Sequence, residues 1–320
     1  MEIGKEDDMN QGAERLSLRK WGVFSHYLDH QVCDPSSVTN MDKGAIFWND
    51  AVNCIDVERL AYCLHRMNVG YYFLTLMQGT KHMIAPNVAF DAIAGTSPGD
   101  ACSVRDIPME LADALRKYDI DLCLYFTGDG PYKNEEYGKK FGFIEPRRDV
   151  SREFVEKWAS VLEEYSVRYG DKVKAWWMDG CYDFFGYDEE LLDIYYNAIK
   201  KGNPNAAVAF NNGVRPKVEK FYPREEFTAG ESREIRTKSP TEKYTDGALS
   251  HVLFPLGYRE TFTTGAWFCG GVKHPKEYVL DYIKAMNKFG GIVTIDILTY
   301  IDGSFDPEQE ALLRWVGNNL

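Results

Sequence analysis

The chain has 320 residues, of which 44% are hydrophobic and 27% are charged, as in ordinary globular proteins. Its 49 acidic and 37 basic side chains give a formal charge of −12, and a field of this sign repels phosphate backbones and anionic lipid. No stretch rich in Lys, Arg and aromatic residues reverses that balance. We therefore expect neither a nucleic acid nor a membrane surface as a partner.

Residues 1–20 are charged and lack the apolar segment of a secretory signal, which predicts a cytoplasmic protein. A secreted protein whose leader is missing from the sequence would look the same. Residues 1–18 are expected to be flexible or to cap the fold. The seven cysteines are scattered without a CxxC pair, so we expect reduced thiols rather than a disulfide framework or a zinc site.

A short apolar run, a loop rich in Gly, Asp and Asn, and an amphipathic helix recur along nearly the whole chain. This recurrence predicts eight strands that alternate with helices. The expected strands are 21–28, 71–76, 121–127, 174–179, 206–211, 227–231, a weaker one within 251–264, and 291–298.

The helices between these strands are marked by apolar residues at helical spacing and by residues that favour helix ends. We expect helices over 57–67, over 151–169 after an N-cap at Ser151, over 189–201 after Asp188, and over 278–289 before Gly290. A last helix begins after Asp306, where Pro307 and Gln309 at the first and third positions resemble a capping box.

Alternating strands and helices, with strands that are almost wholly apolar, predict a parallel sheet covered by helices. We interpret the chain as one α/β domain over 1–320, a single (β/α)8 barrel of the TIM type. The alternative is a doubly wound open sheet, but no glycine fingerprint for a nucleotide follows the first strand. Segment 216–246 is expected to form long loops around the sixth strand.

In a barrel of this kind the functional residues lie at the carboxyl ends of the strands. The residues there combine carboxylates and amides, which bind hydroxyl groups, with aromatic rings, which stack on sugar rings. A carbohydrate is therefore the expected partner, and no metal or cofactor is implied. The candidates are His26, Tyr27, Gln78, Lys81, His82, Tyr125, Asp129, Trp177, Asp179, Asn211, Asn212, Glu231, Glu260, Trp267 and Asp296.

Two carboxyl groups that face each other are the minimum needed to cleave a glycosidic bond. Asp179 follows Trp177 and Met178 at the end of the fourth expected strand, and either Glu231 or Glu260 could be its partner. One carboxylate would attack or stabilise the anomeric carbon, and the other would protonate the departing oxygen.

Several segments, taken in order, resemble family 29 of the glycoside hydrolases, the retaining α-L-fucosidases. WGVFSHY at 21–27 is similar to the family's first-strand FGIFIHWG, YYFLT at 71–75 to YFVLTAKHHDGF, and LRKYDIDLCLY within 111–125 to the helix and strand ending in GLYYS. WMDG at 177–180 is similar to WFDG, and the stretch from Gly290 through Asp302 and Gly303 to Pro307 is similar to GGNLLLNVGPxPDGxIP.

The resemblance implies a retaining exo-glycosidase for a terminal fucose-like sugar, with Asp179 as the nucleophile. Glu231 is favoured as the acid/base because its spacing from Asp179 is closer to the family's, and Glu260 is kept in reserve. The resemblance also implies that the other candidates bind the sugar. The family's His-His pair is replaced by Gln78 and Gly79, and no C-terminal β-sandwich is expected within these residues.

Two other functions stay open at this point. The chain could be a carbohydrate-binding relative without catalytic activity, in which Asp179 only binds hydroxyl groups. It could also be an isomerase or lyase for a free sugar, with Lys81 or His82 as the base.

Overall fold

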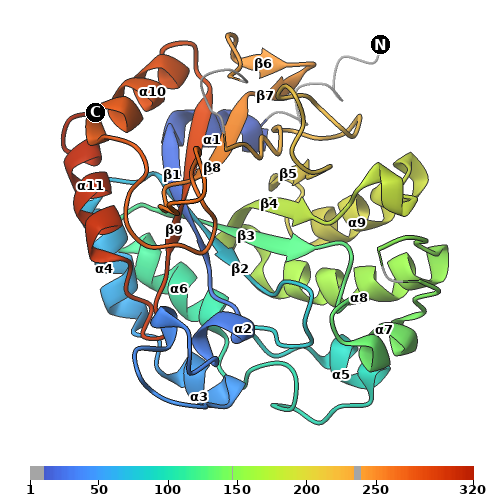
Figure 1. Ribbon diagram of the computed structural model, residues 1–320. Coiled ribbons are helices and arrows are strands. Elements are labelled where there is room, and N and C mark those ends of the chain that lie inside the picture. Colours follow the sequence, from blue (N-terminus) through green and yellow to red (C-terminus); the bar gives the residue numbers. More distant parts are fainter. Residues whose placement is uncertain (1–10, 146, 234–238) are drawn as a thin grey trace, which may run out of the picture.

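The computed structural model describes residues 11–145, 147–233 and 239–320. Seven parallel strands form one curled sheet in the order β5-β4-β3-β2-β1-β9-β8 (Figure 1). The seven strands are β1 (Trp21–His26), β2 (Tyr71–Thr75), β3 (Asp121–Thr127), β4 (Val173–Asp179), β5 (Ala207–Phe210), β8 (His251–Pro255) and β9 (Ile292–Leu298). A separate antiparallel hairpin joins β6 (Tyr244–Thr245) to β7 (Ala248–Leu249).

Helices cover the outer face of the sheet (Figure 1). The described helices of at least seven residues, on this face or elsewhere, are α1 (Gln11–Arg19), α4 (Val57–Arg66), α5 (Val88–Ala94), α6 (Ile107–Arg116), α7 (Glu135–Phe141), α8 (Arg152–Tyr169), α9 (Glu189–Gly202), α10 (Lys276–Lys288) and α11 (Pro307–Gly317). Shorter ones are α2 (Asp29–Val32), α3 (Trp48–Asn53) and the 3-10 turns η2 (Val38–Asn40), η3 (Gly170–Lys172) and η4 (Asp183–Phe185). Within the described ranges, no helix has the length and hydropathy required to cross a bilayer.

Two hydrophobic clusters lie on the two faces of the curled sheet. Alternate strand residues such as Phe24, Phe73 and Trp177 point inward and form the inner cluster, whereas their neighbours pack against the helices. Ala13 and Leu16 of α1 belong to the inner cluster. Helix α1, which includes residues 11–18 of the N-terminal segment, therefore covers the amino end of the sheet, while residues 1–10 lie outside the described part.

The seven regular strands confirm an α/β fold with a parallel sheet, but the sixth expected strand, 227–231, is not a regular strand. This segment makes isolated parallel bridges from Phe227 to Leu249 and from Glu231 to Leu253. On its other side, the backbone N–H of Glu226 donates to Val208 in β5. The expectation of eight regular strands is therefore wrong, although segment 226–232 lies between β5 and β8.

β5 pairs regularly with β4, and two buried glutamates explain why no regular strand of the described chain pairs with its other edge. The carboxylate of Glu226 accepts from the backbone N–H of Val208 at 2.8 Å, and that of Glu225 accepts from Phe210 at 2.7 Å. Side chains thus occupy the donors on this edge of β5 that the ladder of a neighbouring strand would use.

The helix ends follow the expected capping residues with one exception. Ser151, Asp188 and Asp306 each accept hydrogen bonds from backbone N–H groups in the first turn of α8, α9 and α11. The side chain of Gln309 does not return to Asp306, because it accepts from Leu298 and donates to the carbonyls of Cys269 and Gly271. It therefore fixes the end of β9 against the loop that carries Trp267.

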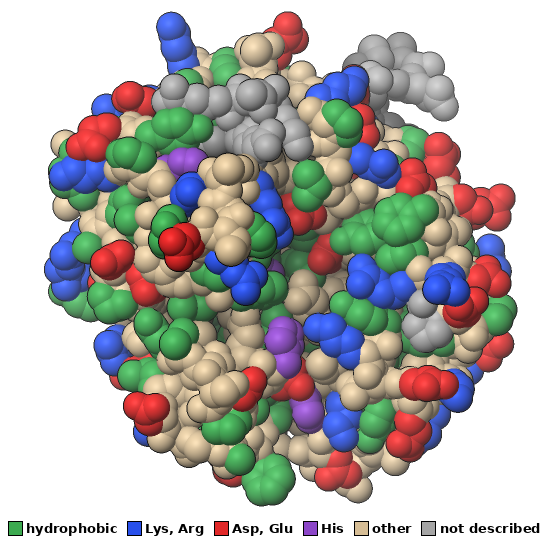
Figure 2. Space-filling view, in the orientation of Figure 1, with side chains coloured by type: hydrophobic (Ala, Val, Ile, Leu, Met, Phe, Trp, Pro, Cys, Tyr) green, Lys and Arg blue, Asp and Glu red, His purple; other side chains and the backbone are tan. Residues whose placement is uncertain are grey.

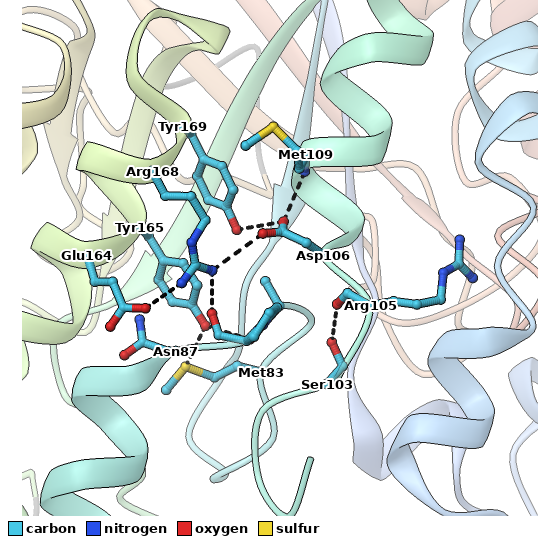
Figure 3. A network of polar contacts seen from close by, with 12 residues as sticks. Met83, Asn87, Ser103, Arg105, Asp106, Met109, Glu164, Tyr165, Arg168 and Tyr169 are labelled. Atoms are coloured by element: carbon cyan, nitrogen blue, oxygen red, sulfur yellow. Dashed lines mark hydrogen bonds and ion pairs between the residues drawn. The ribbon is translucent and has the colours of Figure 1, made fainter. Parts of the chain in front are cut away.

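A charged network ties the helices together on the outside of the sheet (Figure 3). Arg168 of α8 forms ion pairs with Asp106, which caps α6, and with Glu164, one turn earlier in α8. The hydroxyl of Tyr169 also donates to Asp106, at 3.0 Å. These charges are paired with each other and lie outside the inner cluster.

Candidate active site

A pocket opens at the carboxyl end of the parallel sheet, the end at which α/β barrels carry their functional residues. Its free volume is about 90 Å³. The pocket is lined by Phe24, His26, Gln78, Tyr125, Trp177, Asp179, Glu231, Leu253, Trp267 and Phe268. The strands and the loops that connect them therefore bring seven of the candidate residues into one pocket.

The carboxylate of Asp179, the last residue of β4, accepts three hydrogen bonds. The hydroxyl of Tyr125 donates to Oδ2 at 2.5 Å, and the amide of Asn211 donates to Oδ1 at 2.8 Å. The hydroxyl of Tyr182 donates to Oδ1 at 3.2 Å. All three donors are neutral, so they fix the orientation of the carboxylate without cancelling its charge.

Asn211 connects the two carboxyl groups of the pocket. Its Nδ2 atom lies 2.8 Å from Oδ1 of Asp179 and 2.7 Å from Oε2 of Glu231. Because one nitrogen atom reaches both, these two oxygens lie at most 5.5 Å apart. The two carboxyl groups thus face each other at short range.

Glu231 sits in a setting that favours its protonated form. Burial and the nearby charge of Asp179 raise the pKa of Glu231 to about 7, although the hydrogen bond from Asn211 opposes the shift. The backbone around Glu231 is held by the bridge to Leu253 in β8. A carboxyl group that keeps its proton near neutral pH, next to an oriented carboxylate, can act as a general acid.

Aromatic and amide side chains extend the hydrogen-bonded system. Gln78 donates through Nε2 to the hydroxyl of Tyr125 at 2.8 Å, so Tyr125 links Gln78 to Asp179. The ring of Tyr125 stacks on that of Trp177 with centroids 5.5 Å apart, and the indole of Trp177 donates to the carbonyl of Ala229. Burial and the charge of Asp179 raise the pKa of Tyr125 well above its usual range, which keeps this hydroxyl a donor.

On the opposite side of the pocket, β1 and β9 supply a buried pair. Nδ1 of His26 lies 2.8 Å from Oδ1 of Asp296. Burial raises the pKa of Asp296, and the interaction with His26 opposes that rise. Trp267 and Phe268 both contact the ring of His26 edge-on, with centroids 6.0 and 4.5 Å away. Asp296 thus fixes the orientation of a ring that lines the pocket.

Two candidates at strand ends point away from the pocket. The hydroxyl of Tyr27 donates to the backbone carbonyls of Ala51 and Ile301 in the outer core. Asn212 accepts from the backbone N–H of Asp183 and donates to its carboxylate, which holds the turn after β4.

Three further candidates lie outside the pocket lining. Glu260 is exposed on the loop after β8. His82 lies on the loop after β2 and pairs with Asp29. Asp129 lies behind the turn after Asp179, where a Cβ on Gly180 would approach its carboxyl group to 2.5 Å. Gly180, at φ +66°, is therefore required by both backbone conformation and space.

Burial and then the charge of Asp179 raise the pKa of Asp129 well above its usual range. Nε of Arg147 lies 3.2 Å from Oδ2 of Asp129, but its alignment does not make a hydrogen bond. Asp129 is thus an electrostatic neighbour of Asp179 rather than part of the pocket lining.

Tyr182, Phe24 and Phe268 belong to the site but were not among the candidates from the sequence. Tyr182 lies only three residues after Asp179, yet nothing in the spacing indicates that its hydroxyl turns back to the carboxylate. Phe24 could have been found, because it precedes His26 by two residues and shares its face of the strand. Phe268 follows Trp267 directly, and its φ of +60° is unusual for a bulky residue.

Solved structures with a similar fold include two endo-fucoidan hydrolases of glycoside hydrolase family 107, both 16% identical, with TM-scores of 0.70 and 0.69. They cover 99% and 97% of the present chain, which spans only 55% and 64% of theirs. An α-L-fucosidase of family 29 from Bacteroides thetaiotaomicron has a TM-score of 0.64 at 17% identity, covering 96% of this chain and 72% of its own.

A search of curated proteins found no match by sequence. The sequence model of the α-L-fucosidase family, in contrast, matches residues 97–320. That range contains Tyr125, Asp179, Asn211 and Glu231, the hydrogen-bonded centre of the pocket. The chain belongs to the α-L-fucosidase family of glycoside hydrolases.

Proposed function

We propose that this protein hydrolyses the glycosidic bond of a fucose-like sugar with retention of anomeric configuration. The observation that carries the proposal is the position of Asn211, which holds oxygens of Asp179 and Glu231 at most 5.5 Å apart. Retaining glycosidases place their carboxyl groups about 5–5.5 Å apart, whereas inverting enzymes need about 6.5–9.5 Å to admit a water molecule. Membership in the α-L-fucosidase family supports fucose as the type of sugar.

In the first step, Asp179 attacks the anomeric carbon while Glu231 donates its proton to the departing oxygen. The bond to the leaving group breaks, and a glycosyl-enzyme ester forms on Asp179. The raised pKa of Glu231 keeps this proton available near neutral pH. The hydrogen bonds from Tyr125, Asn211 and Tyr182 orient the carboxylate of Asp179 before the attack.

In the second step, Glu231 as carboxylate removes a proton from water, which attacks the anomeric carbon and releases the sugar. The charge of Asp179 is neutralised in the ester, so the main electrostatic cause of the raised pKa of Glu231 disappears at this stage. Glu231 is then suited to act as a base. His26, Gln78 and Trp267, which line the pocket, would bind the hydroxyl groups and the ring.

The proposal also treats the fold as a (β/α)8 barrel in which segment 226–232 takes the place of the missing regular strand. Hydrogen bonds from this segment to Val208 of β5 and to Leu253 of β8 support that placement. Glu231 then stands at the carboxyl end of this position, as the acid/base of a barrel enzyme must.

Intact-mass analysis after incubation with 2-fluoro-L-fucosyl fluoride tests the proposal. We expect one covalent adduct, located by peptide mapping on Asp179, and none on the Asp179→Asn variant. The 2-fluoro derivatives of D-galactose and L-rhamnose provide the specificity control. If no sugar labels the protein but some protect it against heat denaturation, the carbohydrate-binding function without catalysis replaces the proposal.

A further inference from the structure

A second polar cluster lies beside the pocket, on the loops that follow β1 and β2. Nδ1 of His82 lies 2.8 Å from Oδ2 of Asp29, and the hydroxyl of Thr80 donates to Oδ1 at 2.9 Å. Nδ1 of His30 approaches the same carboxylate to 3.7 Å. We call Asp29, His30 and His82 the Asp29 cluster. The catalytic steps proposed above do not use it.

The contacts of the Asp29 cluster orient its histidines toward solvent. Burial would raise the pKa of Asp29, but the interactions with His30, His82 and Thr80 outweigh burial and lower it. The ring of His82 also stacks on Trp48 with centroids 5.8 Å apart. No described residue hydrogen bonds to its Nε2, and the side chains of His82 and His30 are 25% and 38% exposed. The ring of His82 is therefore held in place with Nε2 available for a ligand, and the more exposed His30 lies against the same carboxylate.

Phe268 connects the Asp29 cluster to the pocket. The centroid of its ring lies 4.5 Å from that of His26 inside the pocket and 6.3 Å from that of His30. The side chain is 39% exposed although it is large and apolar, and its backbone has a φ of +60°. Figure 2 shows histidine and acidic side chains next to one another in the hollow of this face. Exposed aromatic rings at a pocket mouth are suited to contact a sugar ring.

The order of the strands places the Asp29 cluster relative to Glu231. In the sheet order, β2 is three strands from β5 in one direction and three from β8 in the other, and segment 226–232 joins those two edges. The loop after β2, which carries His82, is therefore across the pocket from Glu231. Because Glu231 protonates the leaving oxygen, the leaving group departs on the far side from His82.

We propose that the Asp29 cluster is a second carbohydrate subsite, which binds a sugar unit attached to a ring hydroxyl of the residue held in the pocket. This inference rests on the proposed function, because Glu231 defines the leaving-group side. The imidazole nitrogens of His30 and His82 bind hydroxyl groups of the second unit, and Phe268 contacts its ring. The enzyme then cleaves beside a substituted fucose-like residue and is not restricted to a bare terminal one.

The test compares two kinds of chromogenic substrate. 4-Nitrophenyl α-L-fucoside fills the pocket alone, whereas 4-nitrophenyl glycosides of fucosyl disaccharides, linked through O-2, O-3 or O-4, also present a second unit. We expect nitrophenol and intact disaccharide from at least one linkage. His82→Ala should lower kcat/KM for that substrate about tenfold, the effect of one lost hydrogen bond, and leave the monosaccharide glycoside unaffected.

His65→Ala is the matched control, because His65 stacks on Tyr118 outside the sheet. If only the monosaccharide glycoside is cleaved, or if His82→Ala lowers both activities equally, the subsite is disproved. If neither substrate is cleaved, the proposed function fails, and saturation-transfer NMR of fucose and the fucosyl disaccharides with the full chain still tests the subsite. Tighter binding of a disaccharide that His82→Ala abolishes supports it, and equal binding overturns it.

Discussion

The two ends of strand β3 lie in very different electrostatic surroundings. At its start, the carboxylate of Asp121 receives the guanidinium of Arg15 at 2.5 Å and that of Arg19 at 3.0 Å. Near its other end, Tyr125 points to Asp179, which faces Glu231. In the part of the chain that the structure describes, no cation lies within ion-pair distance of Asp179 or Glu231.

This contrast separates a structural acid from acids available for chemistry. Asp121 is compensated by cations from α1, so it fastens that helix over the amino end of the sheet. Asp179 and Glu231 receive only neutral donors, and burial together with their mutual repulsion raises the pKa of Glu231. Perturbed acids in a pocket indicate function, while compensated acids indicate stability.

Replacing Asp179 by Asn should cause the largest effect on activity. Because this change removes the proposed nucleophile, kcat should fall at least about a thousandfold, as it does when a covalent catalyst is removed. The variant should unfold at the same temperature as the wild type or slightly higher, because one member of a repelling pair is gone. Initial rates and thermal melting measure the two effects. If the variant lost its fold together with its activity, Asp179 would be a structural acid like Asp121.

The pH dependence of activity should report Glu231. Its pKa is raised to about 7, so the proton that the proposed first step needs is present below that pH and is lost as the pH rises through it. Activity should decline on the alkaline side with a midpoint near the pKa. In Asp179→Asn, the pKa of Glu231 should fall because the neighbouring charge is gone, which carboxyl NMR can follow. An unchanged pKa would mean that burial alone causes the shift.

Asp121→Asn should lower stability and leave activity unchanged, which is the reverse of the effect expected for Asp179→Asn. Removing the charge leaves Arg15 and Arg19 without their shared partner and should lower the free energy of unfolding by about 2 kcal/mol. The turnover number of the folded protein should stay the same, because Asp121 is at the far end of the sheet. Urea denaturation and kcat measure the two quantities. A large fall in kcat without destabilisation would remove the distinction between the two ends of β3.

The sequence predicts the positions of the strands better than it predicts which acid faces Asp179. Apolar runs locate seven strands, and Asp179 and Asn211 are visible because they close two of them. Whether Glu231 or Glu260 faces Asp179 depends on how segment 226–232 packs between β5 and β8, which local patterns do not encode. The side chains of Glu225 and Glu226 replace strand hydrogen bonds with β5, and such long-range side-chain contacts leave no periodic signal.

Glu225 tests a third kind of buried acid, which forms no ion pair with the described residues and has no proposed catalytic partner. Its carboxylate accepts from the backbone N–H groups of Phe210 and Phe221, but burial outweighs these bonds and raises its pKa from 4.5 to about 8. Between these values the folded state keeps a proton that the unfolded state has lost. Stability is therefore complete below the ordinary carboxyl pKa and declines as the pH rises toward about 8.

Glu225→Gln should remove this contribution, which amounts to about 1 kcal/mol per pH unit in that interval. The variant has lower stability at acidic pH, because its amide cannot accept from both N–H groups, but a flatter dependence of the unfolding free energy on pH. Chemical denaturation from pH 5 to 8 gives both curves, and their difference excludes contributions from Glu231 and other buried acids. Parallel curves would mean that Glu225 is ionised in the folded protein and that its two backbone donors compensate it as fully as arginines compensate Asp121.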